Sequence, residues 1–238
     1  MFARKAALIG VFASLHATLY FIPLLWRSCS ILLIPLEGII LGPKAGYLSA
    51  LIGSAIARAI EPGDFWMFGI FAEPIGVLAA SLLSEGKWKH VLTIYGVMLA
   101  AYFIHPLSWH LPLWTILDIL FASSLIYPAA KSCKKIFEES SKRLFISLVL
   151  ISFISTAADS LARIFLFIPM GLSHLFFASI EEIRDVFILG AVCSYAEDII
   201  AIVASPTVGV PLLLALRKIP EAKYLLSFRE GAAGKKEP

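Results

Sequence analysis

Residues 6–26, AALIGVFASLHATLYFIPLLW, contain no Asp, Glu, Lys or Arg and directly follow Arg4 and Lys5. A transmembrane helix needs about 20 consecutive, mostly apolar residues. A cleaved signal peptide has a shorter apolar region that ends in small residues at a cleavage site, whereas this run continues unbroken to Trp26. We therefore expect residues 6–26 to form an uncleaved first membrane helix.

The composition of the whole chain agrees with a membrane protein. Of the 238 residues, 59% are hydrophobic and 16% are charged, whereas about a quarter of a soluble domain is charged. The fold class that follows is an all-α integral membrane protein, a polytopic bundle of six to eight transmembrane helices. The expected segments after the first are residues 28–42, 45–60, 65–83, 91–105, 112–130, 144–168 and 186–216.

The distribution of basic residues predicts the orientation of these segments. Cytoplasmic loops of membrane proteins are enriched in Lys and Arg. If all eight segments cross and the N-terminus is cytoplasmic, sixteen of the 20 basic residues lie inside, and Arg27, Arg58, Arg163 and Arg184 are the exceptions. We therefore expect both termini to be cytoplasmic, with a transmembrane domain over residues 1–217 and a short cytoplasmic tail over residues 218–238.

Small residues recur every four positions on four of the segments. They are Gly38, Gly42, Gly46, Ala50 and Ser54, then Ala72, Gly76 and Ala80, and on the first helix Ala6, Gly10 and Ser14. Such stripes allow close helix–helix contact in lipid. One interpretation is packing within the bundle; the other is a groove that docks a second membrane protein, for which the stripe on the first helix is the better candidate.

Ionisable side chains within the spans are the second candidate feature, because each costs about 2.5–3.5 kcal/mol to insert. They are Glu37, Arg58, Glu73, Asp118, Asp159, Arg163, Glu197 and Asp198. Asp159 and Arg163 are four residues apart and so share a helix face. They form either a self-neutralising ion pair or the charged wall of a ligand cavity. Glu37, beside Pro35, is expected to cap its helix or to pair locally.

The predicted outer loops add aromatic and titratable residues. Tryptophan at a membrane interface is commonly an anchor, but aromatic faces with a few polar groups also form small-molecule sites. We predict a substrate-binding site in the outer half of the bundle, made by Trp66, Glu73, Trp109, His110, Asp159, Arg163 and Glu181.

Common catalytic signatures do not occur in the sequence. There is no GxxxxGK[ST] phosphate loop, no HExxH and no GxSxG, and these are the patterns of P-loop ATPases, zinc proteases and serine hydrolases. The three cysteines form no CxxC pair. We expect no enzyme activity in this chain, no catalytic residues, no metal site and no cofactor. The basic residues lack interleaved aromatics, so no nucleic-acid partner is expected.

Residues 34–48, IPLEGIILGPKAGYL, carry a family resemblance. The spacing apolar-Pro-x-x-Gly-x-x-x-Gly-Pro-x-x-Gly resembles the start of the substrate-binding membrane subunits (S components) of energy-coupling factor (ECF) transporters. The resemblance covers about residues 1–83 and implies a short second crossing, a tight turn at Gly42-Pro43 and a third helix. It also implies that Ala6, Gly10 and Ser14 dock on the coupling subunit. Such subunits usually have six crossings, so residues 91–130 would be an additional helix pair.

The resemblance implies that the chain is the substrate-specific part of an ABC importer in the cell membrane. It would capture a vitamin or another micronutrient from outside and deliver it inward together with a coupling transmembrane subunit and two ABC ATPase subunits. One alternative is a stand-alone secondary transporter with an intramembrane relay of carboxylates and Arg. Less favoured alternatives are a membrane enzyme acting on lipids or isoprenoids and a scaffold protein.

Overall fold

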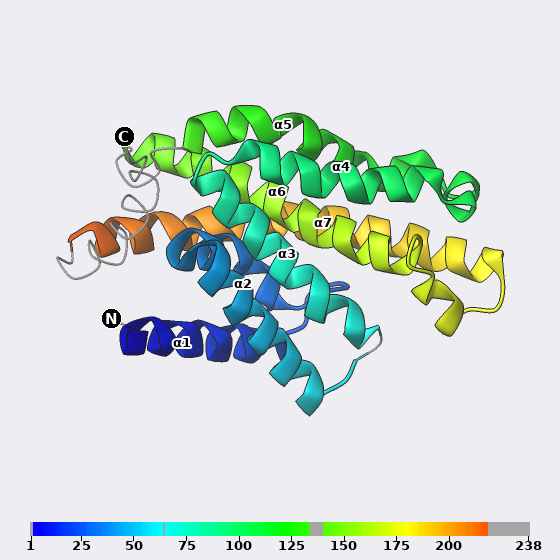
Figure 1. Ribbon diagram of the computed structural model, residues 1–238, viewed down its shortest axis with the longest axis horizontal. Coiled ribbons are helices and arrows are strands. Elements are labelled where there is room, and N and C mark those ends of the chain that lie inside the picture. The colour runs from blue at the N-terminus through cyan, green and yellow to red at the C-terminus, as the bar shows by residue number, and fades with distance from the viewer. Residues whose placement is uncertain (1, 64, 134–139, 219–238) are drawn as a thin grey trace, which may run out of the picture.

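Seven α-helices make up most of the computed structural model, which describes residues 2–63, 65–133 and 140–218 (Figure 1). The helices are α1 (Phe2–Tyr20), α2 (Ile34–Ile60), α3 (Trp66–Ser84), α4 (Trp88–Ile104), α5 (Leu117–Cys133), α6 (Ser141–Phe167) and α7 (Ile180–Lys218). Short 3-10 helices lie at Cys29–Leu32, Pro106–His110, Leu113–Ile116 and Leu172–Leu175. The described ranges contain no β-strand beyond a single bridge between Pro23 and Ser28.

Five of these helical segments are long and apolar enough to cross a membrane. They are Ile34–Ile60, Trp66–Ser84, Leu113–Cys133, Ser141–Phe167 and Ile180–Lys218, and Lys5–Tyr20 and Trp88–Ile104 are shorter apolar helices. Each segment expected from the sequence overlaps one of these elements. The prediction of an all-α polytopic membrane bundle is therefore confirmed.

The first helix is shorter than the sequence predicts. Helix α1 ends at Tyr20, and residues 21–28 form a loop instead of continuing the helix to Trp26. Proline lacks an N–H for the helical hydrogen bond and disfavours the helical conformation of the residue before it. Pro23 therefore stops α1 although the sequence around it remains apolar.

Helix α2 reverses direction at Gly42. Gly42 has φ 82° and ψ 178°, a conformation that is essentially restricted to glycine, and Pro43 follows it. The two expected segments 28–42 and 45–60 thus meet at a tight turn inside α2. Residues 34–41 rise roughly 12 Å at 1.5 Å per residue, which is too short to span a bilayer, while the second piece is a full-length helix.

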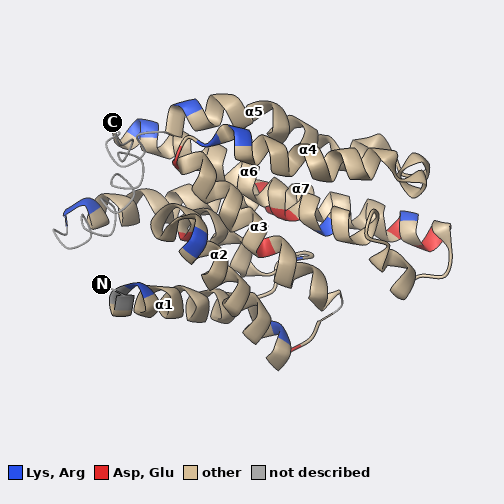
Figure 2. Cartoon of the chain, viewed as in Figure 1, with Lys and Arg blue, Asp and Glu red and all other residues tan. Residues whose placement is uncertain are grey.

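The strongly basic segments share one end of the bundle. Figure 2 shows Lys and Arg concentrated at the end that holds the start of α1 and the end of α7. Lys131 lies in the last turn of α5, and Arg217 and Lys218 lie in the last turn of α7. This agrees with both ends of the chain lying on one side, and the assignment of that side to the cytoplasm stays a prediction. The expected tail, residues 218–238, lies outside the described residues except for Lys218.

Helices α3 and α6 form the centre of the bundle, and small residues set their spacing. The apolar spans of α3 and α6 are the most buried of the five. A Cβ on Gly38 would lie 2.5 Å from the carbonyl oxygen of Val77, and one on Gly76 would lie 2.8 Å from that of Ser155. The stripes on α2 and α3 thus serve packing within the bundle, as the first of the two interpretations expects.

The Gly42 turn yields a test with an internal control. Gly42→Ala places a Cβ in a conformation that costs about 1–3 kcal/mol for a side chain, so the detergent-solubilised variant should unfold at a lower temperature. Gly96→Ala makes the same chemical change on α4, where nothing lies within 4 Å of the added carbon. That variant should be neutral or stabilised by up to about 1 kcal/mol. Equal melting temperatures for the two variants would contradict the strained turn.

Candidate functional site

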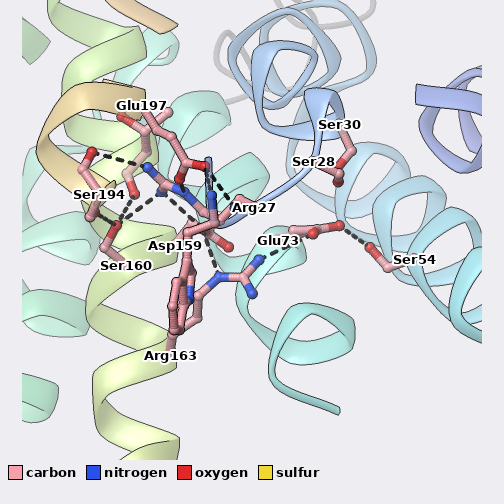
Figure 3. A network of polar contacts seen from close by, with 12 residues as sticks. Arg27, Ser28, Ser30, Ser54, Glu73, Asp159, Ser160, Arg163, Ser194 and Glu197 are labelled. Atoms are coloured by element: carbon pink, nitrogen blue, oxygen red, sulfur yellow. Dashed lines mark hydrogen bonds and ion pairs between the residues drawn. The ribbon is translucent and has the colours of Figure 1, made fainter. Parts of the chain in front are cut away.

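A network of charged side chains lies buried at the centre of the bundle (Figure 3). It combines α1, α2, α3, α6, α7 and the loop after α1. Its members are His16, Arg27, Glu37, Arg58, Glu73, Asp159, Arg163, Glu197 and Asp198. A charge in this environment is tolerated only with partners at close range, so the contacts of each member determine what the network can do.

Glu73 on α3 is the member with contacts to the most elements. Its Oε1 accepts from Arg58 Nη2 at 2.5 Å and from Arg163 Nη2 at 3.1 Å. Its Oε2 lies 2.7 Å from His16 Nε2 and accepts a hydrogen bond from the hydroxyl of Ser54. This single carboxylate, which is fully buried, therefore ties α1, α2 and α6 to α3.

His16 faces carboxylates with both ring nitrogens. Its Nδ1 lies 2.9 Å from Glu37 Oε2, and its Nε2 contacts Glu73. A neutral imidazole has one N–H, so only the positively charged imidazolium donates to both carboxylates at once. Glu37 was expected to cap or pair within its own segment; instead it pairs with α1, because the turn at Gly42 folds the start of α2 against His16.

Arg27 anchors the loop after α1 to α7. The loop is closed by hydrogen bonds from Leu24 N to Arg27 O at 3.0 Å and from Cys29 N to Ile22 O at 2.8 Å. Glu197 Oε1 accepts from the backbone N–H groups of Trp26 and Arg27, at 2.6 and 2.7 Å. Glu197 Oε2 accepts from Arg27 Nε at 2.6 Å. One α7 carboxylate thus fixes both the backbone and the side chain of this loop.

The remaining donors of Arg27 bind α6 and α7. Nη1 donates to Asp159 Oδ2 at 3.3 Å and to Ser160 Oγ at 3.0 Å, while Nη2 donates to Asp198 Oδ1 at 2.9 Å and to the carbonyl of Ser194 at 3.4 Å. With the Nε contact to Glu197, all five N–H groups of the guanidinium are used. Arg27 is therefore a structural cation with no donor left for a ligand.

Asp159 and Arg163 connect the contacts around Glu73 to the contacts around Arg27. Arg163 Nε donates to Asp159 Oδ2 at 3.0 Å, the i,i+4 pair that the sequence predicts, and its Nη2 reaches Glu73. Figure 3 shows Arg163 lying between these two carboxylates. An unbroken series of charged contacts therefore runs from His16 through Glu73, Arg163 and Asp159 to Arg27.

A cavity of about 120 Å³ adjoins this network. It lies where the last turn of α6 and the loop around Arg27 meet the N-terminal parts of α3, α5 and α7. By the predicted topology this is the outer half of the bundle. The walls are formed by Trp26, Arg27, Phe65, Phe68, Thr115, Asp118, Ile119, Ser160, Arg163, Ile164, Phe167, Val186, Phe187, Gly190, Ala191 and Ser194. Its lining combines aromatic rings with a few charged and hydroxyl groups, as in many small-molecule sites.

The structure brings three of the predicted substrate-binding residues together. Glu73, Asp159 and Arg163 belong to the buried network, and Arg163 also lines the cavity. The other four, Trp66, Trp109, His110 and Glu181, are exposed and do not line it. Trp109 donates its indole N–H to the carbonyl of Phe103 at 2.9 Å, which fits a position at the end of a helix.

Several members of the site were not among the predicted residues. His16 and Arg27 were missed, as were the phenylalanines of the cavity wall. A signal existed for both polar residues: His16 is the one basic residue in the first apolar run, which contains no Asp, Glu, Lys or Arg, and Arg27 is one of the four exceptions to the charge rule. Of those four, Arg27, Arg58 and Arg163 are in the network, and Arg184 is exposed.

The predicted partner-docking residues lie on the surface of the bundle. Ala6, Gly10 and Ser14 are all exposed on α1. A Cβ added at Gly10 would meet nothing within 4 Å, whereas Ala13, His16 and Ala17 on the same helix are buried. The stripe on α1 therefore differs from those on α2 and α3, because it packs against no other part of the described chain at Gly10.

The described ranges show no cluster of three or more His, Cys, Asp or Glu side chains arranged to hold a metal ion. The carboxylates of the network are instead directed at arginine and histidine.

Replacing Glu73 tests its role as the shared acceptor. Glu73→Gln keeps the volume but leaves Arg58, Arg163 and His16 without their common counter-charge, and breaking a buried pair costs about 3–5 kcal/mol. Thermal unfolding in detergent should show a large loss of stability. The matched change Glu181→Gln, at an exposed position, should shift stability by less than about 0.5 kcal/mol. A Glu73→Gln variant as stable as Glu181→Gln would refute this role.

Comparison with known proteins gives one distant similarity. No family model matches the chain, and no solved structure matches it. A 127-residue stretch is 27% identical to the uncharacterized protein MJ0923 of Methanocaldococcus jannaschii. The match covers 52% of this chain and 42% of that relative, so it spans less than half of the relative's length.

Proposed function

We propose that the chain is the substrate-binding membrane subunit of an ECF-type ABC importer. It captures a vitamin or another micronutrient from outside at the cavity beside Arg163. It then delivers the cargo inward together with a coupling transmembrane subunit and two ATPase subunits. The observation that carries the proposal is the exposed small-residue face of α1 on a bundle that also holds a cavity lined by aromatic and polar side chains.

The α1 face supports docking of another membrane helix. Gly10 has open space where a side chain would lie, and Ala6 and Ser14 flank it one turn away on either side. Small residues allow backbones to approach closely, and helix association in lipid depends on such contact. The other side of α1 is held to its own bundle, because His16 contacts Glu37 and Glu73.

The cavity supports capture of a small molecule. Apolar walls with a few polar groups are typical of ligand sites, and here Arg163, Asp118, Ser160 and Ser194 provide the polar groups. The chain contains no phosphate loop, so an ATP-driven process would take its energy from separate subunits.

The buried carboxylates favour a second candidate, a secondary transporter. Asp118 Oδ1, Asp159 Oδ1 and Asp198 Oδ2 are buried and accept no hydrogen bond from the described residues. Carboxylates in this position form proton or ion relays in membrane transporters. Uptake into vesicles of a small molecule found to co-purify with the chain would separate the two candidates: the importer needs ATP and partner subunits, whereas the secondary transporter needs an ion gradient and no partner.

Blocking the α1 face tests the proposal. Gly10→Leu adds a bulky side chain where the structure leaves open space, so folding and ligand binding should persist. Uptake by cells and co-purification of the coupling subunit in mild detergent should be lost. Native mass spectrometry of the purified complex measures both the ligand and the partners.

The matched control adds bulk to a different face of the same helix. Val11 is 62% exposed, and Val11→Phe should leave uptake and complex formation unchanged. If Gly10→Leu keeps full uptake, α1 is not the docking face. If it loses ligand binding as well, the face belongs to the bundle itself.

Arg163 links the network to the cavity and should contribute to ligand affinity. Arg163→Ala removes a charged part of the cavity wall and one of the cationic partners of Asp159 and of Glu73, so we expect ligand affinity to fall by about tenfold or more. Arg184→Ala removes an exposed arginine of α7 and should leave affinity unchanged. Unaltered affinity in a folded Arg163→Ala variant would show that Arg163 serves only the internal ion pairs.

A further inference from the structure

The charges around the cavity do not balance. Together with Asp118, the network holds six carboxylates: Glu37, Glu73, Asp118, Asp159, Glu197 and Asp198. Against them stand Arg27, Arg58, Arg163 and the His16 imidazolium. The N-terminus of α5 next to Asp118 adds about half a positive charge. With all six carboxylates ionised the region lacks more than one positive charge, and uncompensated charge is costly in a membrane interior. The carboxyl groups of Asp118 and Asp198 lie within hydrogen-bonding range of each other, so a shared proton supplies one of the missing charges when no ligand is bound. A cationic ligand would replace that proton.

The deficit is concentrated on the side of the cavity. Asp118 lines the cavity, and its Oδ1 is buried without a hydrogen-bond partner among the described residues. Its carboxyl group lies within hydrogen-bonding range of the carboxyl group of Asp198 on α7. Asp198 Oδ2 is also buried and accepts no hydrogen bond from the described residues. Asp159 Oδ1 is in the same state. Three helices, α5, α6 and α7, thus each present one acidic oxygen that accepts no hydrogen bond from the described residues.

The arginines of the cavity wall cannot fill this deficit. All five N–H groups of Arg27 are occupied, three of its contacts being to carboxylates. Arg163 is held between Asp159 and Glu73. The positive charge of each guanidinium is therefore already balanced by the carboxylates that it contacts, and neither is available to the remaining acidic oxygens.

Aromatic rings complete the cavity. Phe65 lies 6.4 Å from the ring of Trp26 in a stacked arrangement and 4.9 Å from Phe176 in an edge-to-face one. Trp26, Phe65, Phe68, Phe167 and Phe187 all contribute to the wall. The faces of such rings attract cations as well as apolar groups, so the apolar part of the wall and the acidic part favour the same kind of ligand.

We propose that the cavity binds a small organic cation, with its positively charged nitrogen at Asp118 and its apolar body against the aromatic wall. The inference rests on the proposed function, since it names the chemical class of the cargo. It adds that the captured micronutrient carries a positive charge, which supplies the charge missing from the buried network. Nη1 of Arg163, which makes no hydrogen bond to the described residues, would donate to a neutral acceptor on the same molecule.

A set of three probes of similar shape tests the charge preference on the full chain in detergent. The probes are 2-phenylethylammonium, 2-phenylethanol and phenylacetate, and isothermal titration calorimetry measures each affinity at the same pH and salt concentration. The ammonium probe should bind at least about tenfold more tightly than the alcohol, because it alone forms a charge-assisted hydrogen bond with the carboxylate. Equal or weaker binding of the ammonium probe, or a preference for phenylacetate, overturns the inference.

Variants locate the preference. Asp118→Asn should abolish the advantage of the ammonium probe over the alcohol while leaving alcohol binding within about twofold. Asp185→Asn, at an exposed position of α7, should leave the advantage intact. A preference that survives Asp118→Asn would overturn the assignment of the cation to Asp118.

The wild-type comparison needs no variant, so a poorly folded Asp118→Asn chain does not remove the test. These measurements use the isolated chain and no partner subunit. If the ammonium probe shows no advantage, the inference about the cargo is wrong but the proposed importer role is unaffected. If the Gly10→Leu experiment instead contradicts the importer role, the affinities of the three probes can still be compared.

Discussion

The carboxylate of Glu73 is the contact on which the rest of the bundle depends. Apolar side chains gain little from leaving lipid for other apolar side chains, so close packing and polar contacts hold membrane helices together. Glu73 brings His16, Arg58 and Arg163 to one buried point, and so fixes α1, α2 and α6 around α3. The glycines at 38, 46 and 76 make these distances possible by letting the helix backbones approach.

The same residues that hold the bundle together also form one wall of the cavity. Arg163 both neutralises Asp159 and Glu73 and lines the cavity, and Arg27 joins the loop after α1 to α7 beside it. Functional sites commonly keep groups that local stability alone would not favour. Here the buried carboxylates with unpartnered oxygens lower the free energy of unfolding. A bundle selected only for stability would have apolar residues in their place.

Periodicity and charge were sufficient to predict the helices, because a membrane span is a property of a continuous stretch of sequence. They failed at residues 21–28, where apolar residues continue but Pro23 ends the helix. The cost of buried charge identified Glu73, Asp159 and Arg163. The same reasoning did not reveal that Trp66, Trp109, His110 and Glu181 lie on the surface, because aromatic and titratable residues also occur at exposed helix ends. Arg27 and the phenylalanine wall depend on how two loops fold back on the bundle, and no local pattern encodes that contact.

The series of ion pairs from His16 to Arg27 has a thermodynamic consequence. It connects α1, whose outer face is exposed, to the wall of the cavity without an apolar interruption. Coupling between two sites is reciprocal: whatever free energy a ligand contributes to the position of α1, a protein docked on α1 returns to the affinity for the ligand. In the proposed importer, a partner whose docking moves α1 away from Glu73 would lower the affinity for a ligand that favours the undisturbed position of α1, so docking and ligand release would be coupled through one equilibrium.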